Sequence, residues 1–497
     1  MTSSVEQPIA SGALRRSRFF SLFPSIMLPM SLAVIDQTIV ASALPAIAGS
    51  LGDVERISWV VIGYLVANTI AAPVYGYVGD VFGRRRLLIG ALALFMVASV
   101  LCALAPSIPL LAAARVLQGL GGGGLMTLSQ ALVGQVVPPR ERGNYQGYLA
   151  TMATVASAIG PVIGGFLTEG FGWPWIFLIN VPLGLIAILL VLRLPSGQQA
   201  SQRDWHFDFP GLLFYVAFIV PVLLALQQIQ HLDPRTVWTI ALLLALSVIA
   251  LVLLIRQEGR SKAPLLPLDL ISQPAMWRAC ALAMCHGAAL TALIAFLPIY
   301  FRVVDGTSAA ETGYLLLPVT MGLGIGSIII GRIVTRTGRT MIFPSIGLIA
   351  ATLILIFFAI ASTHLTATQI SWTICLAMFF MGTVMGVVQI TAQTRAGHRL
   401  GAAAATVQLS RAVGASFGTA IVGTILFASL AATDSQAAQL FAKAIDLGPD
   451  ALMQLSEGQR AIVAAEISSA FRYAFGVLAL FTAGGMILAW TNPSRRI

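Results

Sequence analysis

Charge is scarce in this chain. Only 10% of its 497 residues are Asp, Glu, Lys or Arg, whereas soluble domains carry about 25%. Hydrophobic residues make up 58% of the positions. Apolar runs of about 18 residues or more recur along the sequence, and each can cross the ~30 Å of a bilayer's hydrocarbon core. This composition excludes a water-soluble globular protein and indicates an all-α integral membrane protein.

Cysteine and histidine are also few, with four and five copies. The cysteines lie inside apolar runs, and their spacing matches neither a disulfide framework nor a zinc site. We find no cluster of histidines and acids, no nucleophile motif and no loop that resembles an ATP-binding loop. The sequence therefore predicts no metal, no cofactor and no enzymatic activity.

We expect fourteen transmembrane helices, in groups of six, two and six. They are centred near residues 32, 67, 96, 121, 155, 184, 220, 246, 289, 323, 351, 381, 415 and 480. Polar, proline-bounded stretches at 192–210 and 255–274 separate the groups. The predicted domains are a six-helix bundle at 1–194, linkers with two inserted helices at 195–275, and a second six-helix bundle at 276–497. The sequence leaves the role of the inserted helices open.

The two bundles carry traces of a duplication. GYVGDVFGR at 76–84 and GRIVTRTGR at 331–339 share the frame Gly-x3-[Asp/Thr]-x2-Gly-Arg. Duplicated halves are typical of transporters that bind their substrate between the halves and rock around it.

Basic residues outnumber acidic ones, 29 to 19. Most of them fall in alternate loops, the pattern of a membrane protein with positive loops inside the cell. The surplus charge thus reflects topology rather than nucleic-acid binding. It predicts that both termini are cytoplasmic.

Asp36 is the one acidic residue that we place deep within a predicted span. A carboxylate there is costly, so it marks a functional site by default. In such surroundings it can exchange a proton near neutral pH. Arg115, in LLAAARVLQGLGGGG, also lies inside a span, with Gln118 on the same helix face. Arg115 either extends to the outer interface or faces a cavity and pairs with Asp36 in one conformation, which would favour release of the proton.

The loop GYVGDVFGRRR supplies a candidate gate formed by Gly76, Asp80, Gly83, Arg84 and Arg85. Gly76 allows close helix packing and Gly83 a tight turn. Asp80 can face a helix N-terminus or an arginine across the domain interface, which would form a charge clamp that breaks when the transporter opens inward. The alternative is an ordinary positive-inside loop.

GPVIGGFL at 160–167 is a candidate hinge, because Pro161 weakens a helix beside Gly160, Gly164 and Gly165. Static packing is the alternative. If it is a hinge, Gly165→Leu should block transport.

Further candidates for a cavity are Thr38, Gln118, His286 and Arg411. His286 could relay protons or be a hydrogen-bonded packing residue. The outer loop at 431–469 carries apolar residues at helical spacing. It could form a lid or remain a solvated loop.

These motifs together resemble the fourteen-helix drug:proton antiporter branch of the major facilitator superfamily. IDQTIVASALP at 35–45, GYVGDVFGRRR, ARVLQG, GPVIGG and WPWIFLINVPLG at 173–184 carry the resemblance. It implies proton coupling by Asp36 and Arg115, gating by Asp80 with Arg84 and Arg85, and an antiport hinge at Pro161 and its glycines.

The expected function is proton-coupled multidrug efflux, hence antibiotic resistance, across a bacterial cytoplasmic (inner) membrane. The partners would be small amphipathic substrates, protons, membrane lipid and, in a Gram-negative cell, a periplasmic adaptor, with no nucleic acid. Because the second half lacks an acid within a span, monocations, zwitterions or neutral compounds are favoured over dications. A dedicated exporter of one metabolite, lipid or antibiotic is the alternative.

Overall fold

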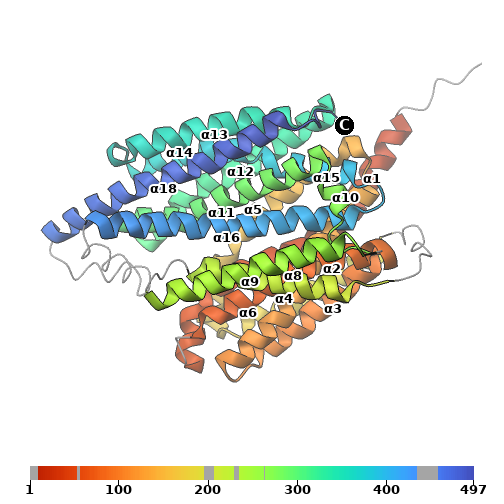
Figure 1. The fold of residues 1–497 in the computed structure, drawn as a ribbon, viewed down its shortest axis with the longest axis horizontal. Coiled ribbons are helices and arrows are strands. Elements are labelled where there is room, and N and C mark those ends of the chain that lie inside the picture. The colour runs from red at the N-terminus through yellow and green to blue at the C-terminus, as the bar shows by residue number, and fades with distance from the viewer. Residues whose placement is uncertain are drawn as a thin grey trace, which may run out of the picture. The chain divides into compact units, whose positions relative to one another are not determined.

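The computed structural model describes residues 9–52, 56–194, 206–228, 234–261, 263–433 and 457–496. Within these ranges the chain is built from helices (Figure 1), and the only β-type pairing is an isolated bridge between Arg339 and Arg496. A backbone in a bilayer must satisfy its polar groups internally, which a helix does. The predicted all-α membrane class is confirmed.

Helices α1 to α7 form the first part of the chain. They are α1 (Ile9–Leu51), α2 (Ser58–Phe82), α3 (Arg84–Ala103), α4 (Ile108–Val136), α5 (Arg142–Phe171), α6 (Trp175–Leu178) and α7 (Asn180–Leu192). The short 3-10 turn η2 (Pro139–Glu141) precedes α5. The span predicted near residue 184 is thus two helical pieces, α6 and α7.

Helices α8 (Phe209–Gln228) and α9 (Pro234–Glu258) are the two inserted helices of the prediction, and α10 (Leu268–Ile271) follows them. The rest of the chain forms α11 (Pro274–Val303), α12 (Ala309–Thr337), α13 (Ile342–Ala361), η3 (Ser362–His364), α14 (Ala367–Met381), α15 (Val384–Arg395), α16 (Leu400–Thr433) and α18 (Glu457–Thr491). The span predicted near residue 381 is again split, into α14 and α15.

Thirteen helical segments in the described ranges are long and apolar enough to cross a membrane. Each coincides with a predicted span. The remaining prediction, near residue 121, is the 29-residue helix α4. Its glycines, Arg115 and Gln118 make α4 less apolar than its neighbours, so length alone supports it as the fourteenth span.

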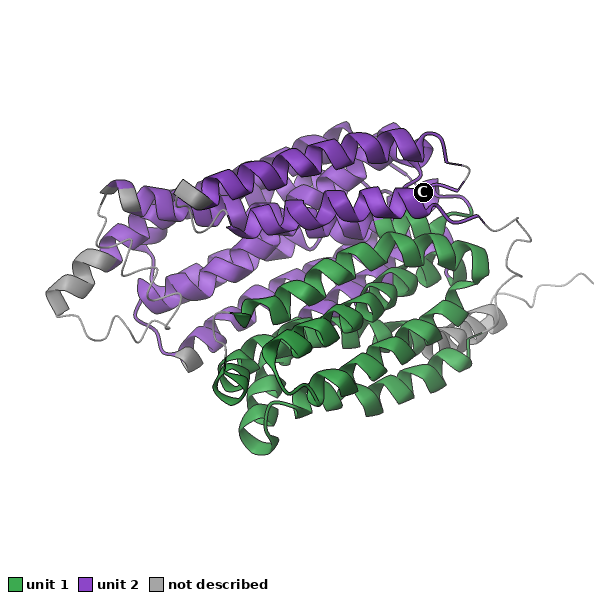
Figure 2. Ribbon diagram, turned by 60° about the horizontal axis from the view of Figure 1, so that its bottom comes forward, with its two compact units in different colours: residues 1–136, 156–205, 398–405 green, residues 137–155, 206–397, 406–497 purple. Residues whose placement is uncertain are grey.

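Contacts group the chain into two compact units (Figure 2). Unit 1 comprises Met1–Val136, Ala156–Trp205 and His398–Ala405, and unit 2 comprises Val137–Val155, His206–Gly397 and Thr406–Ile497. This differs from the predicted domains, which followed chain order. Helix α5 gives its first half to unit 2 and its second half to unit 1, whereas only the first turns of α16, up to Ala405, belong to unit 1 and the rest of α16 to unit 2. The inserted helices α8 and α9 belong to unit 2.

The cytoplasmic ends of α8 and α9, by the predicted topology, are tied together by a buried acid. Asp208 precedes α8 and accepts a hydrogen bond from the backbone nitrogen of Gly211, at 2.8 Å, as an N-cap does. The same Asp208 oxygen accepts from Gln257 Nε2 near the end of α9, at 2.9 Å. The two helices therefore form a self-contained hairpin within unit 2.

The predicted outer loop at 431–469 is shorter than expected. Helix α16 continues to Thr433 and α18 begins at Glu457. Glu466 is consequently a helical residue near the start of a candidate span, Ala464–Thr491, and not a loop residue. The rest of the predicted lid, with its amphipathic spacing, lies outside the described residues.

Candidate functional site: a buried ion pair in unit 1

Asp36 forms an ion pair with Arg115 inside unit 1. The Asp36 side chain on α1 is 0% exposed, and Arg115 on α4 is 1% exposed. Arg115 Nη1 donates to Asp36 Oδ2 at 2.6 Å. The alternative in which Arg115 extends to the outer interface is therefore wrong for this conformation, and the predicted pairing is confirmed.

Two amides complete the coordination of Asp36. Gln118 Nε2 donates to Asp36 Oδ1 at 2.8 Å, and Asn180 Nδ2 donates to the same oxygen at 2.9 Å. Gln118 also accepts from Arg115 Nη1 at 2.7 Å and donates to Ser99 Oγ at 2.8 Å. The network joins α1, α3, α4 and α7, so four helices must keep their register for it to form.

Aromatic rings and backbone enclose the guanidinium group. The Arg115 side chain lies over the ring of Tyr64, with 4.1 Å from its Cζ to the ring centroid, and its Nε donates to the carbonyl of Val60. Glycines bring α4 close enough for this, since a Cβ atom at Gly119 or Gly123 would collide with the backbone carbonyls of Tyr64 and Asn68. The glycines of α4 thus allow this helix to pack closely against α2, with Arg115 placed beside Asp36.

The hydrogen-bond pattern around Asp36 is that of an ionised carboxylate. Arg115, Gln118 and Asn180 all donate to it, and a deprotonated carboxylate is a pure acceptor. All three groups use Asp36 as an acceptor, so they complement a carboxylate at this position.

Asp80 binds a helix N-terminus, as the sequence suggested, and its arginine partner is the neighbouring Arg84 of the same motif. Arg84 Nη2 donates to Asp80 Oδ1 at 2.6 Å. Gly401 N donates at 2.9 Å and Ala402 N at 3.2 Å, both at the N-terminus of α16. Exposed backbone N–H groups at a helix start favour a carboxylate. Gly76 lets α2 approach this end of α16, because a Cβ there would meet the Gly401 carbonyl oxygen at 2.7 Å.

The turn after α2 forms as predicted, but Arg85 lies elsewhere. Gly83 has a φ of 97°, a conformation that favours glycine. Arg85 Nε donates to the carbonyl of Val191, and its Nη2 to that of Leu192, at the end of α7. Arg85 therefore caps a helix C-terminus and does not bind Asp80, since the neighbouring Arg84 already occupies that carboxylate.

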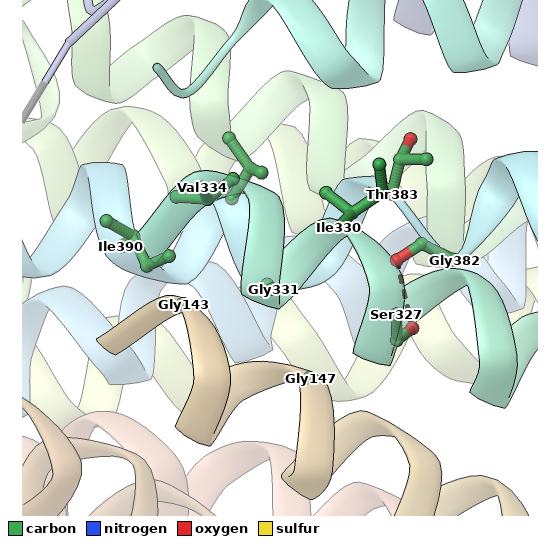
Figure 3. Close-up of a pocket in the computed structure, with 11 residues that line it drawn as sticks. Gly143, Gly147, Ser327, Ile330, Gly331, Val334, Gly382, Thr383 and Ile390 are labelled. Atoms are coloured by element: carbon green, nitrogen blue, oxygen red, sulfur yellow. Dashed lines mark hydrogen bonds between the residues drawn. The ribbon is translucent and has the colours of Figure 1, made fainter. Parts of the chain in front are cut away.

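The second copy of the motif makes a parallel contact in unit 2. Thr335, which replaces the acid, accepts a hydrogen bond from Asn144 N in the first turn of α5, at 3.1 Å. Figure 3 shows Gly143 and Gly147 of α5 facing Gly331 of α12 across a small cavity. Its volume of about 10 Å³ holds one water molecule at most. This cavity is a packing feature, because ligand pockets measure about 300–1,000 Å³.

Removing the charge of Asp80 should slow transport. We expect Asp80→Asn to lose charge-assisted hydrogen bonds worth about 1.5–3 kcal/mol, which corresponds to a rate loss of about 10–100-fold if closure of this contact limits the cycle. The measurement is uptake into everted vesicles at matched expression. Arg85→Gln serves as the control, since Arg85 does not touch Asp80. Wild-type uptake by Asp80→Asn would show that the contact is a static loop anchor.

The glycines of the candidate hinge differ from one another. In unit 1, a Cβ at Gly160 would collide with Thr38 Oγ1, and one at Gly164 with Ser42 Oγ and the Ile39 carbonyl. Gly165 has nothing within 4 Å of such an atom. The prediction that Gly165 belongs to the packed surface is wrong, because it lies on the open side of α5. Pro161 lies within the continuous helix α5.

This difference gives a matched pair of variants. Gly164→Val should force α5 away from α1, a form of overpacking that costs about 1–3 kcal/mol, and should reduce transport and thermal stability together. Gly165→Val adds the same side chain one residue along, where there is space, and should behave like the wild type. Uptake and melting temperature in detergent check both. Equal effects of the two variants would rule out an α1–α5 contact as the cause.

The remaining candidates do not join the Asp36 network. Thr38 donates to the carbonyls of Val34 and Ile35 and packs against Gly160. His286 (3% exposed) and Arg411 lie in unit 2, on α11 and α16. His286 Nδ1 is buried without a hydrogen-bond partner, which argues against a hydrogen-bonded packing histidine.

Three network residues were missed at the level of sequence. Asn180, Ser99 and Tyr64 are neutral residues within apolar runs, where most polar side chains only bond to their own helix. Asn180 had a usable signal, since an amide in IFLINVPLG is polar and cannot be satisfied by the backbone alone. Ser99 and Tyr64 had none.

Comparison with known proteins shows the family of this chain. The model of the Major Facilitator Superfamily matches residues 26–419. The chain belongs to the major facilitator superfamily. It is therefore a multi-pass membrane protein of that family.

Two relatives illustrate the range of this superfamily. An uncharacterized MFS-type transporter of Mycobacterium tuberculosis is 35% identical over 407 residues, which cover 81% of this chain and 59% of that protein. The chain thus spans about three fifths of the length of this relative. The multidrug transporter protein MdtP of Bacillus subtilis is 29% identical over 458 residues, covering 88% of this chain and 84% of that protein.

Among solved structures, the proton:xylose symporter XylE has the same fold. It aligns with a TM-score of 0.62 at 14% identity and covers 96% of both chains. At this identity the likeness concerns the fold alone.

Proposed function

We propose that this major facilitator transporter is a proton-coupled antiporter, which exports amphipathic compounds across the bacterial cytoplasmic membrane by alternating access. The observation that carries the proposal is the Asp36–Arg115 ion pair, fully buried in unit 1 and satisfied by Gln118 and Asn180. The multidrug transporter MdtP, similar over most of both chains, supports the substrate class.

The coupling follows from the two protonation states of Asp36. When Arg115 lies at 2.6 Å, its positive charge and the two amides favour the ionised carboxylate, so the proton leaves. When the helices move and the pair separates, a buried and unpaired carboxylate is costly and takes up a proton instead. Alternation between these states moves one proton inward for each export step. No cofactor takes part in the proposed cycle.

Substrate charge is limited by the small number of acids within the spans. Asp36 pairs with Arg115 and carries the proton, so it cannot also neutralise a dication. Glu466 lies in a span of the second half but only two residues from its start at Ala464. We therefore propose zwitterionic, monocationic or neutral amphipaths as cargo. Both termini would be cytoplasmic, and membrane lipid would surround the spans.

The test is export driven by a pH gradient alone. Purified protein in liposomes without ATP should accumulate an amphipathic dye when the lumen is acidic, and a protonophore should abolish the accumulation. Accumulation that needs ATP, or that ignores the protonophore, would refute proton coupling. A panel of unrelated toxic compounds in an efflux-deficient host then separates a multidrug exporter from a dedicated one, since the latter protects against one compound only.

A further inference from the structure

Arg411 is a cation of unit 2 that has no counter-charge among the residues that the structure describes. It lies 11 residues into α16, which begins at Leu400, and therefore about 16 Å along the helix axis at 1.5 Å per residue. The candidate span runs from Leu400 to Leu430, so Arg411 lies within it and not at either end. The charge of an arginine inside a span is costly unless something compensates it.

The protein supplies little compensation for Arg411. Its one hydrogen bond to the described residues joins its Nε to Gln408 Oε1, at 3.0 Å, one turn back on the same helix. No ion pair and no aromatic ring contact of Arg411 occurs among the described residues. Arg115 in unit 1 is the opposite case, because an acid, an amide and an aromatic ring surround it. Arg115 is neutralised, and Arg411 is not.

The imidazole of His286, beside Arg411, also has a nitrogen without a hydrogen-bond partner among the described residues. His286 on α11 is 3% exposed, and its Nδ1 has no partner. Arg411 is the charged residue that acts on it electrostatically. Close backbone packing fixes the two helices, since a Cβ at Gly287 would collide with the Arg411 carbonyl oxygen, and one at Gly414 with that of Met284. A guanidinium group and a free imidazole nitrogen are thus held together on neighbouring helices.

We infer that Arg411, His286 and Gln408 form an anion-binding site that takes a carboxylate or similar monoanionic group of the exported compound. Free guanidinium nitrogens bind a carboxylate with charge-assisted, often paired, hydrogen bonds. Imidazole can add one more donor, and Gln408 holds Nε so that the outer nitrogens remain available. A ligand anion that neutralises Arg411 removes the cost of an unpaired, half-buried cation within the span, which favours anionic cargo over neutral cargo of the same shape.

This inference rests on the proposed export function and narrows its cargo. It favours zwitterions, adds amphipathic monoanions, and disfavours lipophilic monocations at this site. Asp36 and Arg115 keep their role in moving the proton, because both lie in unit 1 while the anion site lies in unit 2.

The test compares 1-naphthaleneacetate with 1-naphthaleneacetamide, which share a ring system and differ in charge. Binding of each radiolabelled probe is measured on the purified full-length protein in lipid nanodiscs. The wild type should bind the acetate at least ~10-fold more tightly than the amide, since charge-assisted hydrogen bonds exceed neutral ones. Arg411→Gln should abolish this preference while leaving binding of the amide unchanged, and Arg411→Lys should retain part of it.

Arg472→Gln is the matched control, since Arg472 is an exposed arginine of unit 2 that donates to the Ala359 carbonyl. The inference is overturned if the wild type binds neither probe or binds the amide more tightly than the acetate. It is also overturned if Arg411→Gln still prefers the acetate, or if this variant binds both probes more weakly by the same factor. The two proposals can fail separately. If the protein prefers the acetate through Arg411 but does not export in response to a pH gradient, only the proton coupling is refuted.

Discussion

Asp36→Asn should eliminate uphill export while leaving the protein folded. Asparagine has nearly the shape of aspartate and can keep hydrogen bonds to the amides of Gln118 and Asn180, but it carries no exchangeable acidic proton. Accumulation driven by a pH gradient in liposomes should therefore fall to the level of liposomes without protein. Because the helices can still alternate, exchange of labelled for unlabelled substrate should persist at equal pH on both sides.

Ser99→Ala is the control for this variant. It removes a hydroxyl group that contacts Gln118 and Asn180 but no charge, so it should weaken export only modestly. Uphill accumulation by Asp36→Asn at the wild-type level would contradict the assigned role. Loss of both accumulation and exchange would instead point to a structural role for the carboxylate.

The second large effect is expected at Arg115. Arg115→Met leaves Asp36 buried without its counter-charge, and removal of one partner of a buried pair costs about 3–5 kcal/mol. The measurement is thermal unfolding of the wild type and the variant in the same detergent and buffer.

Two further variants make the Arg115 prediction specific. Asp36→Leu combined with Arg115→Met replaces the whole pair by apolar groups and should recover most of the stability, as other buried pairs do. Arg411→Met removes an intramembrane cation that has no counter-charge among the described residues, so it should not destabilise the protein. Equal destabilisation by Arg115→Met and Arg411→Met would show that the loss of stability comes from the packing of the aliphatic part of the arginine side chain and not from ion pairing.

The helical architecture could be predicted from the sequence because apolar length directly determines whether a segment spans a bilayer. Each of the fourteen predicted spans coincides with a helix or a helix pair. The grouping into compact units could not be predicted, since α5 and α16 are each divided between units. Chain order carries no information about which neighbours a long helix packs against along its length.

The site was predictable where a residue is costly in its surroundings. Asp36 and Arg115 are charged residues within apolar runs, so each requires a partner of opposite charge. In the structure they pair with each other. Neutral polar residues such as Asn180 gave a weaker signal. Gly164 and Gly165 are indistinguishable in composition, and only the packing of α5 against α1 separates them. For the same reason, Arg84 and Arg85 share a motif but bind different groups.

The most direct test of the central claim is a count of protons exchanged when substrate binds. Calorimetric titration of the purified protein, in buffers that differ in their enthalpy of ionisation, yields the number of protons released or taken up per substrate. The account predicts a net proton transfer for the wild type near neutral pH and none for Asp36→Asn at comparable affinity. A proton transfer by Asp36→Asn equal to that of the wild type would show that another group carries the proton and would contradict the account.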